Sequence, residues 1–254
     1  MKRRQEEAAM PLGTGLDAAR ADAHRLAAAA RSILACPADV HLVVDGVDDV
    51  TAGLDDAGLA LQDLGGRPVL TCPADAALAH AATDGRSALL TLHSGLGSPS
   101  SPDRDAVLTL SGRLVADGPE ECACCGELRA RVALDLDFAV LDRRDGPAAG
   151  RLRVPLAAFT SPDHDLNRGF LQRAVEHANE CHQDELRRAL ATRAGTRLGD
   201  LLGVQLCGLR PDGVVLRWVD TTGAHQHELR FPRAARSAAD LGELLRSELH
   251  EGLC

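Results

Sequence analysis

The chain has 254 residues, enough for one large domain or two modest ones that each bury a core without disulfide or metal support. Its 28 basic and 37 acidic side chains give a formal net charge of −9. Lys and Arg nowhere cluster with aromatic residues, so the composition argues against a nucleic-acid-binding surface. No run of about 18 apolar residues occurs and no apolar segment follows the basic start, so we expect a cytoplasmic protein without a membrane span.

The first predicted element is a helix over residues 15–35, because strong helix formers dominate and no Pro occurs from Gly15 until Pro37. Six short apolar runs of strand length follow, each bounded by Gly, Pro, Asp or Ser. They cover residues 41–44, 68–71, 87–92, 106–110, 132–136 and 139–141. Short helices are predicted between them, over residues 73–82 and 120–131. This order predicts an α+β domain with a small antiparallel sheet that closes on itself.

A polar, turn-forming stretch at residues 159–167 predicts a linker between a first domain of residues 1–158 and a second of residues 168–254. The second domain is predicted to open with one long helix over residues 168–194. Three strands follow, over residues 204–209, 214–220 and 225–231, and a last helix starts at Ser237. We therefore predict a helix, a three-stranded antiparallel meander and a helix.

Eight cysteines in a chain without a signal peptide are expected to be reduced thiols. Cys122, Cys124 and Cys125 form a C-x-C-C pattern without the two-residue gap of a typical zinc site, and no second C-x-x-C follows. We therefore expect plain thiols on a helix at these positions and assign them no role.

The most chemically dense segment is residues 177–182, His-Ala-Asn-Glu-Cys-His. His182 falls on the apolar stripe of the predicted helix, so it is predicted to face the core and there to bond a partner, border a cavity or ligate a metal. His177 lies about 140° away around an ideal helix, which disfavours one ion held by both histidines. His177 and Cys181 share a second face, a weaker candidate for a metal-binding pair.

One structural alternative stays open for His182: it is an ordinary core histidine whose ring hydrogen-bonds to a backbone carbonyl. Asn179 and Glu180 are expected to cap, hydrogen-bond or solvate a local break in the helix.

Further histidines occur on the last predicted strand. His225, His227, Leu229 and Phe231 alternate onto one face, and the apolar members predict that this face is inward. His227 would then approach the helix that carries His182. Solvent exposure at the edge of the sheet is the alternative, favoured more for His225 than for His227.

Residues 177–182 resemble the His-Met-Asn-Glu-Asp-His signature of a small domain of unknown function that is fused to split β-barrels of the pyridoxamine-phosphate-oxidase type, including HugZ-like haem-utilisation proteins. The turn at residues 208–213 and the segment 231–233 extend the resemblance to about a third of the chain. Ala178 and Cys181 stand where the signature has Met and Asp. The resemblance implies an FMN-binding-type split β-barrel followed by the small α+β domain.

Some relatives of this kind bind haem, and others act in haem breakdown or associate with enzymes of tetrapyrrole synthesis. The resemblance therefore implies a haem-binding or haem-handling protein, with or without catalytic activity. His182 is the implied axial ligand of the haem iron, with His177 and His227 as further cofactor-binding candidates. A homodimer formed through the barrel is implied, together with a protein partner in tetrapyrrole or iron metabolism.

Two other functions stay open. A cofactor-free regulatory or interaction protein built on a dimeric scaffold is favoured by the poor aromatic inventory of four Phe, one Trp and no Tyr. A flavin-dependent oxidoreductase of the split-barrel class ranks last. FMN phosphate needs basic and hydroxyl side chains at strand ends, and only Arg86, Ser87 and Arg113 are scattered candidates, so FMN is not expected.

Overall fold

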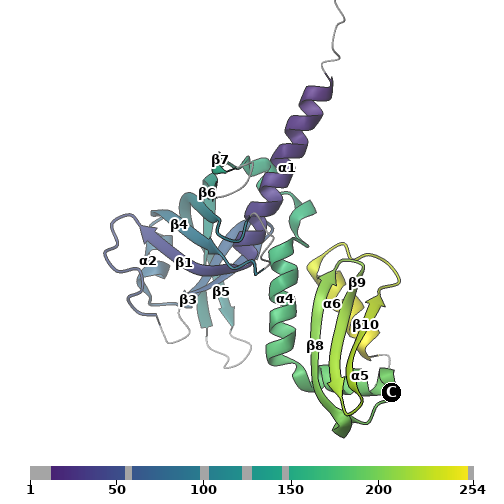
Figure 1. The fold of residues 1–254 in the computed structure, drawn as a ribbon. Helices are drawn as coiled ribbons and strands as arrows, with labels where there is room; N and C mark the ends of the chain where they lie inside the picture. Colours follow the sequence, from purple (N-terminus) through teal and green to yellow (C-terminus); the bar gives the residue numbers. More distant parts are fainter. Residues whose placement is uncertain (1–12, 55–58, 98–102, 122–127, 145–148, 251–254) are drawn as a thin grey trace, which may run out of the picture.

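A computed structural model describes residues 13–54, 59–97, 103–121, 128–144 and 149–250. These residues form a mixed α+β structure with one seven-stranded and one three-stranded antiparallel sheet (Figure 1). No helix within these ranges combines the length and the apolar character that crossing a bilayer requires.

The helix predicted over residues 15–35 is confirmed as α1 (Gly13–Ala35). Its C-terminal half is buried through the small and branched side chains of Ala27, Ala30, Ile33 and Leu34. Its N-terminal half extends away from the sheet (Figure 1). The alanine-rich sequence therefore provides both the helix propensity and a thin face that the sheet can approach closely.

The larger sheet is curled into a half-barrel around a core of aliphatic side chains. Its strands are β1 (Pro37–Val44), β2 (Ala60–Leu64), β3 (Arg67–Pro73), β4 (Ser87–Ser94), β5 (Val107–Glu121), β6 (Leu128–Arg143) and β7 (Gly150–Arg153). Their order is β1-β4-β5-β6-β3-β2, and β7 pairs with β6. The long strand β6 thus pairs with β5 along one edge and with β3 and β7 along the other.

The helix predicted over residues 120–131 is wrong. Glu120 pairs with Arg129 and Glu121 with Leu128, so the described part of this stretch belongs to the hairpin of β5 and β6. The cross-strand hydrogen bonds of a long ribbon override the local helix propensity here. The thiols predicted at residues 122, 124 and 125 lie outside the described residues.

One irregularity explains why β6 was predicted as two strands. The register of β5 and β6 shifts between Ser111 and Gly112, because Ser111 pairs with Phe138 but Gly112 with Leu136. Asp137 is the extra residue of this β-bulge, and it interrupts the alternation of apolar and polar residues along β6. The helix predicted over residues 73–82 corresponds to the shorter α2 (Ala77–Thr83), and strands β2 and β7 were not predicted.

The second half of the chain is a small sheet backed by helices. Its elements are α3 (Leu156–Phe159), the 3-10 turn η1 (Pro162–His164), α4 (Arg168–Cys181), α5 (Gln183–Ala194), the 3-10 turn η2 (Leu198–Asp200), β8 (Leu201–Arg210), β9 (Gly213–Asp220), β10 (Gly223–Arg230) and α6 (Ala238–His250). The Ser237 hydroxyl accepts a hydrogen bond from the Asp240 backbone N–H at 3.2 Å and so caps α6. A second apolar core lies between the helices and the sheet, formed chiefly by leucines such as Leu186, Leu206 and Leu241.

The stretch between the two halves is packed rather than loose. Phe159 and His164, at relative exposures of 0% and 3%, lie in the region predicted as a linker. Helix α4 approaches α1 so closely that a Cβ on Gly169 would lie 1.8 Å from the Ser32 carbonyl oxygen. Only glycine fits at this crossing, so α1 and α4 form a fixed contact between the two halves (Figure 1).

A buried arginine joins α1 to this stretch. Arg31 is 1% exposed, and its Nε donates to the Asp63 carboxylate at 2.7 Å. Its other nitrogens donate to the Phe159 carbonyl at 3.0 Å and to the Asp165 carboxylate at 3.1 Å. A guanidinium with this many fixed acceptors is suited to a buried position, and it links the sheet, α1 and the junction.

We predict that Arg31→Ala lowers the free energy of unfolding by about 3–5 kcal/mol, because it leaves the Asp63 carboxylate buried without its countercharge. Urea denaturation of both proteins measures the difference. The control is Arg20→Ala, which removes an exposed arginine of the same helix and should change stability by less than about 0.5 kcal/mol. Equal stability of the two variants would refute the structural role of Arg31.

Candidate functional site

The helix predicted over residues 168–194 is broken at His182. Helix α4 ends at Cys181, His182 has φ −122° and ψ 30°, and α5 starts at Gln183. The side-chain amide of Gln183 donates to the Asn179 carbonyl at 2.8 Å. In a continuous helix the backbone N–H of Gln183 would bond to that carbonyl, so the side chain replaces a backbone hydrogen bond and the chain turns.

Asn179 fixes the end of α4 to the small sheet. Its side-chain oxygen accepts from the Leu206 backbone N–H, and its side-chain nitrogen donates to the Leu206 carbonyl, both at 2.8 Å. Strand β8 is an edge strand, so this amide satisfies backbone groups that no neighbouring strand could pair. The expectation that Asn179 hydrogen-bonds near a helix break is confirmed.

The prediction that His182 faces the core is wrong. Its side chain is 51% exposed, because the break at this residue takes it off the inward stripe that Leu186 and Ala189 continue. The predicted separation of the two histidines is wrong for the same reason. The Nε2 atoms of His177 and His182 lie 3.3 Å apart, and their rings meet at 78° with centroids 5.0 Å apart.

The two histidines stand at the mouth of a cavity of about 410 Å³ in the second half of the chain, which we call the C-terminal cavity. Its lining is mainly apolar and comes from α4, α5, β8 and α6: Ala178, Leu186, Ala189, Leu206, Gly242, Leu245 and Leu249, with His177, His182, Glu185 and Arg246 as its polar members. A few polar groups in a mainly apolar pocket are typical of small-molecule sites, in which they orient the ligand.

Glu185 and Arg246 add charge of both signs beside the imidazoles. The Glu185 carboxylate oxygen lies 3.9 Å from Nδ1 of His182, which places a negative charge next to the ring. The Nε of Arg246 donates to the Gly242 carbonyl at 3.2 Å. The cavity mouth can therefore offer an imidazole nitrogen to a metal and a guanidinium to an anion.

The histidines of β10 do not join this site. His225 and His227 share a sheet face with Leu229, as expected, but His227 is exposed and does not line the C-terminal cavity. His225 is the half-buried member, which reverses the expectation. Its ring stacks on Trp218 with centroids 5.1 Å apart, and its Nε2 lies 2.9 Å from the Asp220 carboxylate.

Asp220 organises the turn that holds His225. Hydrogen bonds from the Thr222 hydroxyl and then from the His225 ring hold the pKa of the Asp220 carboxyl well below its usual range. The same carboxylate also accepts from the backbone N–H groups of Thr222 and Gly223. These contacts give His225 a structural role in the β9–β10 turn.

The described cysteines add no further ligands. Cys36 and Cys72 are buried, and burial raises the pKa of the Cys36 thiol to about 11, which keeps it protonated. Cys181 is exposed and does not line the C-terminal cavity. Within the described ranges no three His, Cys, Asp or Glu side chains are grouped closely enough to hold a metal.

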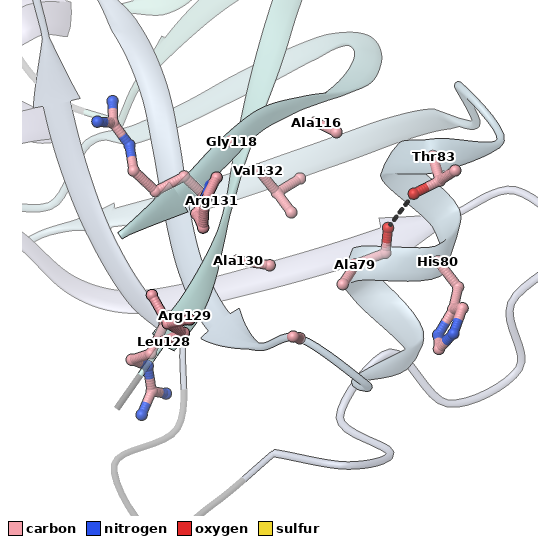
Figure 2. Close-up of a pocket in the computed structure, with 12 residues that line it drawn as sticks. Ala79, His80, Thr83, Ala116, Gly118, Leu128, Arg129, Ala130, Arg131 and Val132 are labelled. Atoms are coloured by element: carbon pink, nitrogen blue, oxygen red, sulfur yellow. Dashed lines mark hydrogen bonds between the residues drawn. The ribbon is translucent and has the colours of Figure 1, made fainter. Parts of the chain in front are cut away.

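A second cavity, of about 450 Å³, lies between α2 and strands β5 and β6 (Figure 2). Figure 2 shows small apolar side chains facing this space, while the guanidinium groups of Arg129 and Arg131 point away from α2. His80 and Thr83 are its polar members on α2, and each hydrogen-bonds to a carbonyl of its own helix. This cavity offers a ligand few oriented polar groups.

A third cavity, of about 500 Å³, lies where α1, η1 and the start of α4 meet. Its charged groups are largely engaged with one another: Arg143 with Asp103 at 2.7 Å, and His24 with Asp163 at 3.3 Å. The flavin-phosphate candidates Arg86, Ser87 and Arg113 line none of the three cavities. The C-terminal cavity therefore has the arrangement best suited to a ligand.

Two lining residues on α6, Gly242 and Arg246, were missed from the sequence. Gly242 carried a usable signal, because a glycine inside a helix costs about 1 kcal/mol relative to alanine and so indicates a packing or functional reason. A Cβ at Gly242 would meet no atom within 4 Å, so its absence leaves open space in the cavity rather than avoiding a clash.

The described residues thus define an α+β protein with a curled half-barrel sheet and a smaller sheet whose helices enclose a histidine-bordered cavity. No protein-family model and no curated protein matches the chain. It is similar to the structure of a heme binding protein from Mycobacterium smegmatis, with 16% identity, 89% of this chain and 97% of that chain covered, and a TM-score of 0.37.

A protein of unknown function from Agrobacterium tumefaciens is similar at 17% identity, over 97% of this chain and all of that chain (100%), with a TM-score of 0.34. The PlzA protein of Borreliella burgdorferi, solved in complex with c-di-GMP, shows 11% identity over 80% of this chain and 78% of that chain, with a TM-score of 0.30. Similarity at this level assigns neither a family nor a function to the chain.

We predict that Asn179→Ala lowers the free energy of unfolding by about 1–3 kcal/mol, because it leaves the Leu206 backbone groups without partners. Chemical denaturation measures the loss. The control is Glu180→Ala, which truncates the exposed neighbour on the same helical turn. If both variants are as stable as the unmodified chain, Asn179 does not anchor α4.

Proposed function

We propose that this chain is a haem-binding protein of the split-barrel, HugZ-like kind, and that haem occupies the C-terminal cavity with His182 as the axial ligand. The observation that carries the proposal is an apolar cavity with two imidazole nitrogens at its mouth. A neutral imidazole nitrogen is a common ligand of haem iron, and apolar walls suit the faces of a macrocycle.

The remaining lining residues fit haem in charge and in size. Arg246, an exposed residue beside the mouth, supplies a cation for a propionate carboxylate. The volume of about 410 Å³ lies near the lower end of the range of about 300–1,000 Å³ for small-molecule pockets, so a bound macrocycle would keep one edge in solvent. That edge would carry the propionates.

His182 is favoured over His177 as the ligand because of Glu185. Histidines that ligate a metal usually donate their other ring N–H to a carboxylate or carbonyl, which orients the ring and raises its basicity. The Glu185 carboxylate lies 3.9 Å from Nδ1 of His182, whereas no carboxylate of the described residues forms an ion pair with His177. His177 is then the adjacent imidazole that would take over weakly in its absence.

We predict that the full chain binds haem with a Soret band, that His182→Ala weakens binding at least tenfold, and that the double variant His177→Ala/His182→Ala abolishes it. Absorption titration with haem measures each affinity. The matched control is His227→Ala, an exposed histidine outside the cavity, which should bind as the unmodified chain does.

Gly242→Leu tests the position of the ligand within the same titration. The added side chain enters open space in the cavity and improves helix propensity, so the variant should fold but lose haem, whereas Gly242→Ala should retain most binding. A flavin band in the purified protein would support a flavin oxidoreductase instead. A featureless spectrum with no response to haem would refute haem binding and favour a cofactor-free interaction protein.

The second candidate is a cofactor-free interaction protein built on a dimer of the half-barrel. A row of neighbouring positions crosses the outer face of the sheet, in which Val43 pairs with Leu89, Leu89 with Ser111 and Ser111 with Phe138. Val43 is 65%, Leu89 43% and Phe138 36% exposed. The Arg153 guanidinium lies over the Phe138 ring, 5.3 Å from its centroid, so Val43 and Leu89 are the apolar part of the row that is open to solvent. These exposed apolar side chains favour a second copy of this chain as their cover.

We predict that the chain sediments as a dimer and that Leu89→Lys converts it to a monomer, because the introduced charge would be buried at the centre of the contact. Analytical ultracentrifugation over a range of concentrations measures the state. The control is Leu202→Lys, which places the same charge on a leucine that is 66% exposed on β8. A monomeric unmodified chain, or a dimer lost equally in both variants, would refute this contact.

A further inference from the structure

The spacing of the two histidines at the cavity mouth resembles the spacing of two ligands of one metal ion. Two nitrogens that each lie about 2.0–2.1 Å from one zinc ion, at the tetrahedral angle, are about 3.3–3.4 Å apart. The Nε2 atoms of His177 and His182 are 3.3 Å apart. Their separation therefore matches two ligands of one tetrahedral ion.

A plain hydrogen bond is the competing explanation, with one ring donating its Nε2–H to the lone pair of the other. The distance of 3.3 Å exceeds the usual 2.7–3.2 Å of N–H···O bonds, so such a bond would be weak. The side chain of His182 is also half exposed, so water competes for both nitrogens. The pair is thus held near the metal-ligand spacing mainly by the helix break.

Glu185 supports the same arrangement. Its carboxylate oxygen lies 3.9 Å from Nδ1 of His182, whereas His177 contacts the other ring nitrogen, Nε2. The negative charge of this carboxylate favours a cation bound at the histidine pair. The carboxylate therefore contributes to the site through its charge.

We propose that His177 and His182 form a site for a divalent ion of the zinc class, Zn²⁺ or Co²⁺, with both Nε2 atoms as ligands and with water or a ligand from the cavity completing the tetrahedron. Borderline-soft ions of this kind prefer imidazole nitrogen. The described part of the chain supplies two protein ligands and no third, so the site binds less tightly than a structural zinc centre and leaves the other two positions to water or to a ligand from the cavity.

The ion and haem exclude one another at this site. Haem iron takes one nitrogen on the side that faces the histidines, whereas the ion needs both. The ion site stands on the histidine spacing alone and does not depend on haem binding. A chain that binds Co²⁺ but not haem would refute the proposed function, and a chain that binds haem but not Co²⁺ would refute the ion site.

The test is a Co²⁺ titration of the full-length chain under reducing conditions, followed by visible absorption. We expect saturation at one Co²⁺ per chain with the intense bands of tetrahedral cobalt, reversal by Zn²⁺, and weakening on acidification because the imidazoles must be neutral to bind. His177→Ala and His182→Ala should each lower the affinity at least tenfold. His227→Ala should leave it unchanged, because this exposed histidine lies outside the mouth.

A thiol control is built into the same spectra. Cobalt bound by cysteine produces an additional sulfur-to-metal charge-transfer band, which the proposed nitrogen site lacks, and Cys181→Ser should not alter the titration. Circular dichroism verifies that each variant is folded. Titration without saturation, binding that persists in both histidine variants, or spectra dominated by the charge-transfer band would each overturn the proposal.

Discussion

The pair of hydrogen bonds between the Asn179 side chain and the backbone N–H and C=O of Leu206 is the contact on which the site depends. It fixes the last turn of α4 to an edge strand, while the neighbouring Gln183 side chain occupies the carbonyl that would have continued the helix. Helix α5 must then leave in a new direction. The space between α5, α6 and β8 becomes the C-terminal cavity, and His177 and His182 meet at its mouth.

The low aromatic content of the core also shapes the architecture. Small side chains permit short distances between elements, and at Gly169 the backbone of α4 meets the backbone of α1. Large apolar side chains cannot interdigitate at such a close crossing, so polar contacts fix the relative position of the two helices. Arg31 provides that anchor with acceptors from three segments, which holds α4 at a defined place relative to the half-barrel.

Periodicity in the sequence predicts the elements whose hydrogen bonds are local and fails where a side chain or a distant strand replaces them. The apolar stripe correctly places Leu186 and Ala189 in the core. It fails at His182, because the periodicity continues through a break that the Gln183 side chain makes. It fails again over residues 120–131, where pairing in a long ribbon outweighs helix propensity. The close approach of His177 and His182 could not be predicted from periodicity either, because it exists only when the helix is broken.

The two positions at which residues 177–182 differ from the signature that they resemble can be located in the folded chain. Ala178 lines the C-terminal cavity, so a methionine there would fill space that the alanine leaves open. Cys181 is exposed and lies outside the lining, so the replacement of an aspartate at this position removes no group from the mouth. The small side chain at residue 178 therefore leaves the apolar chamber open, and residue 181 takes no part in its lining.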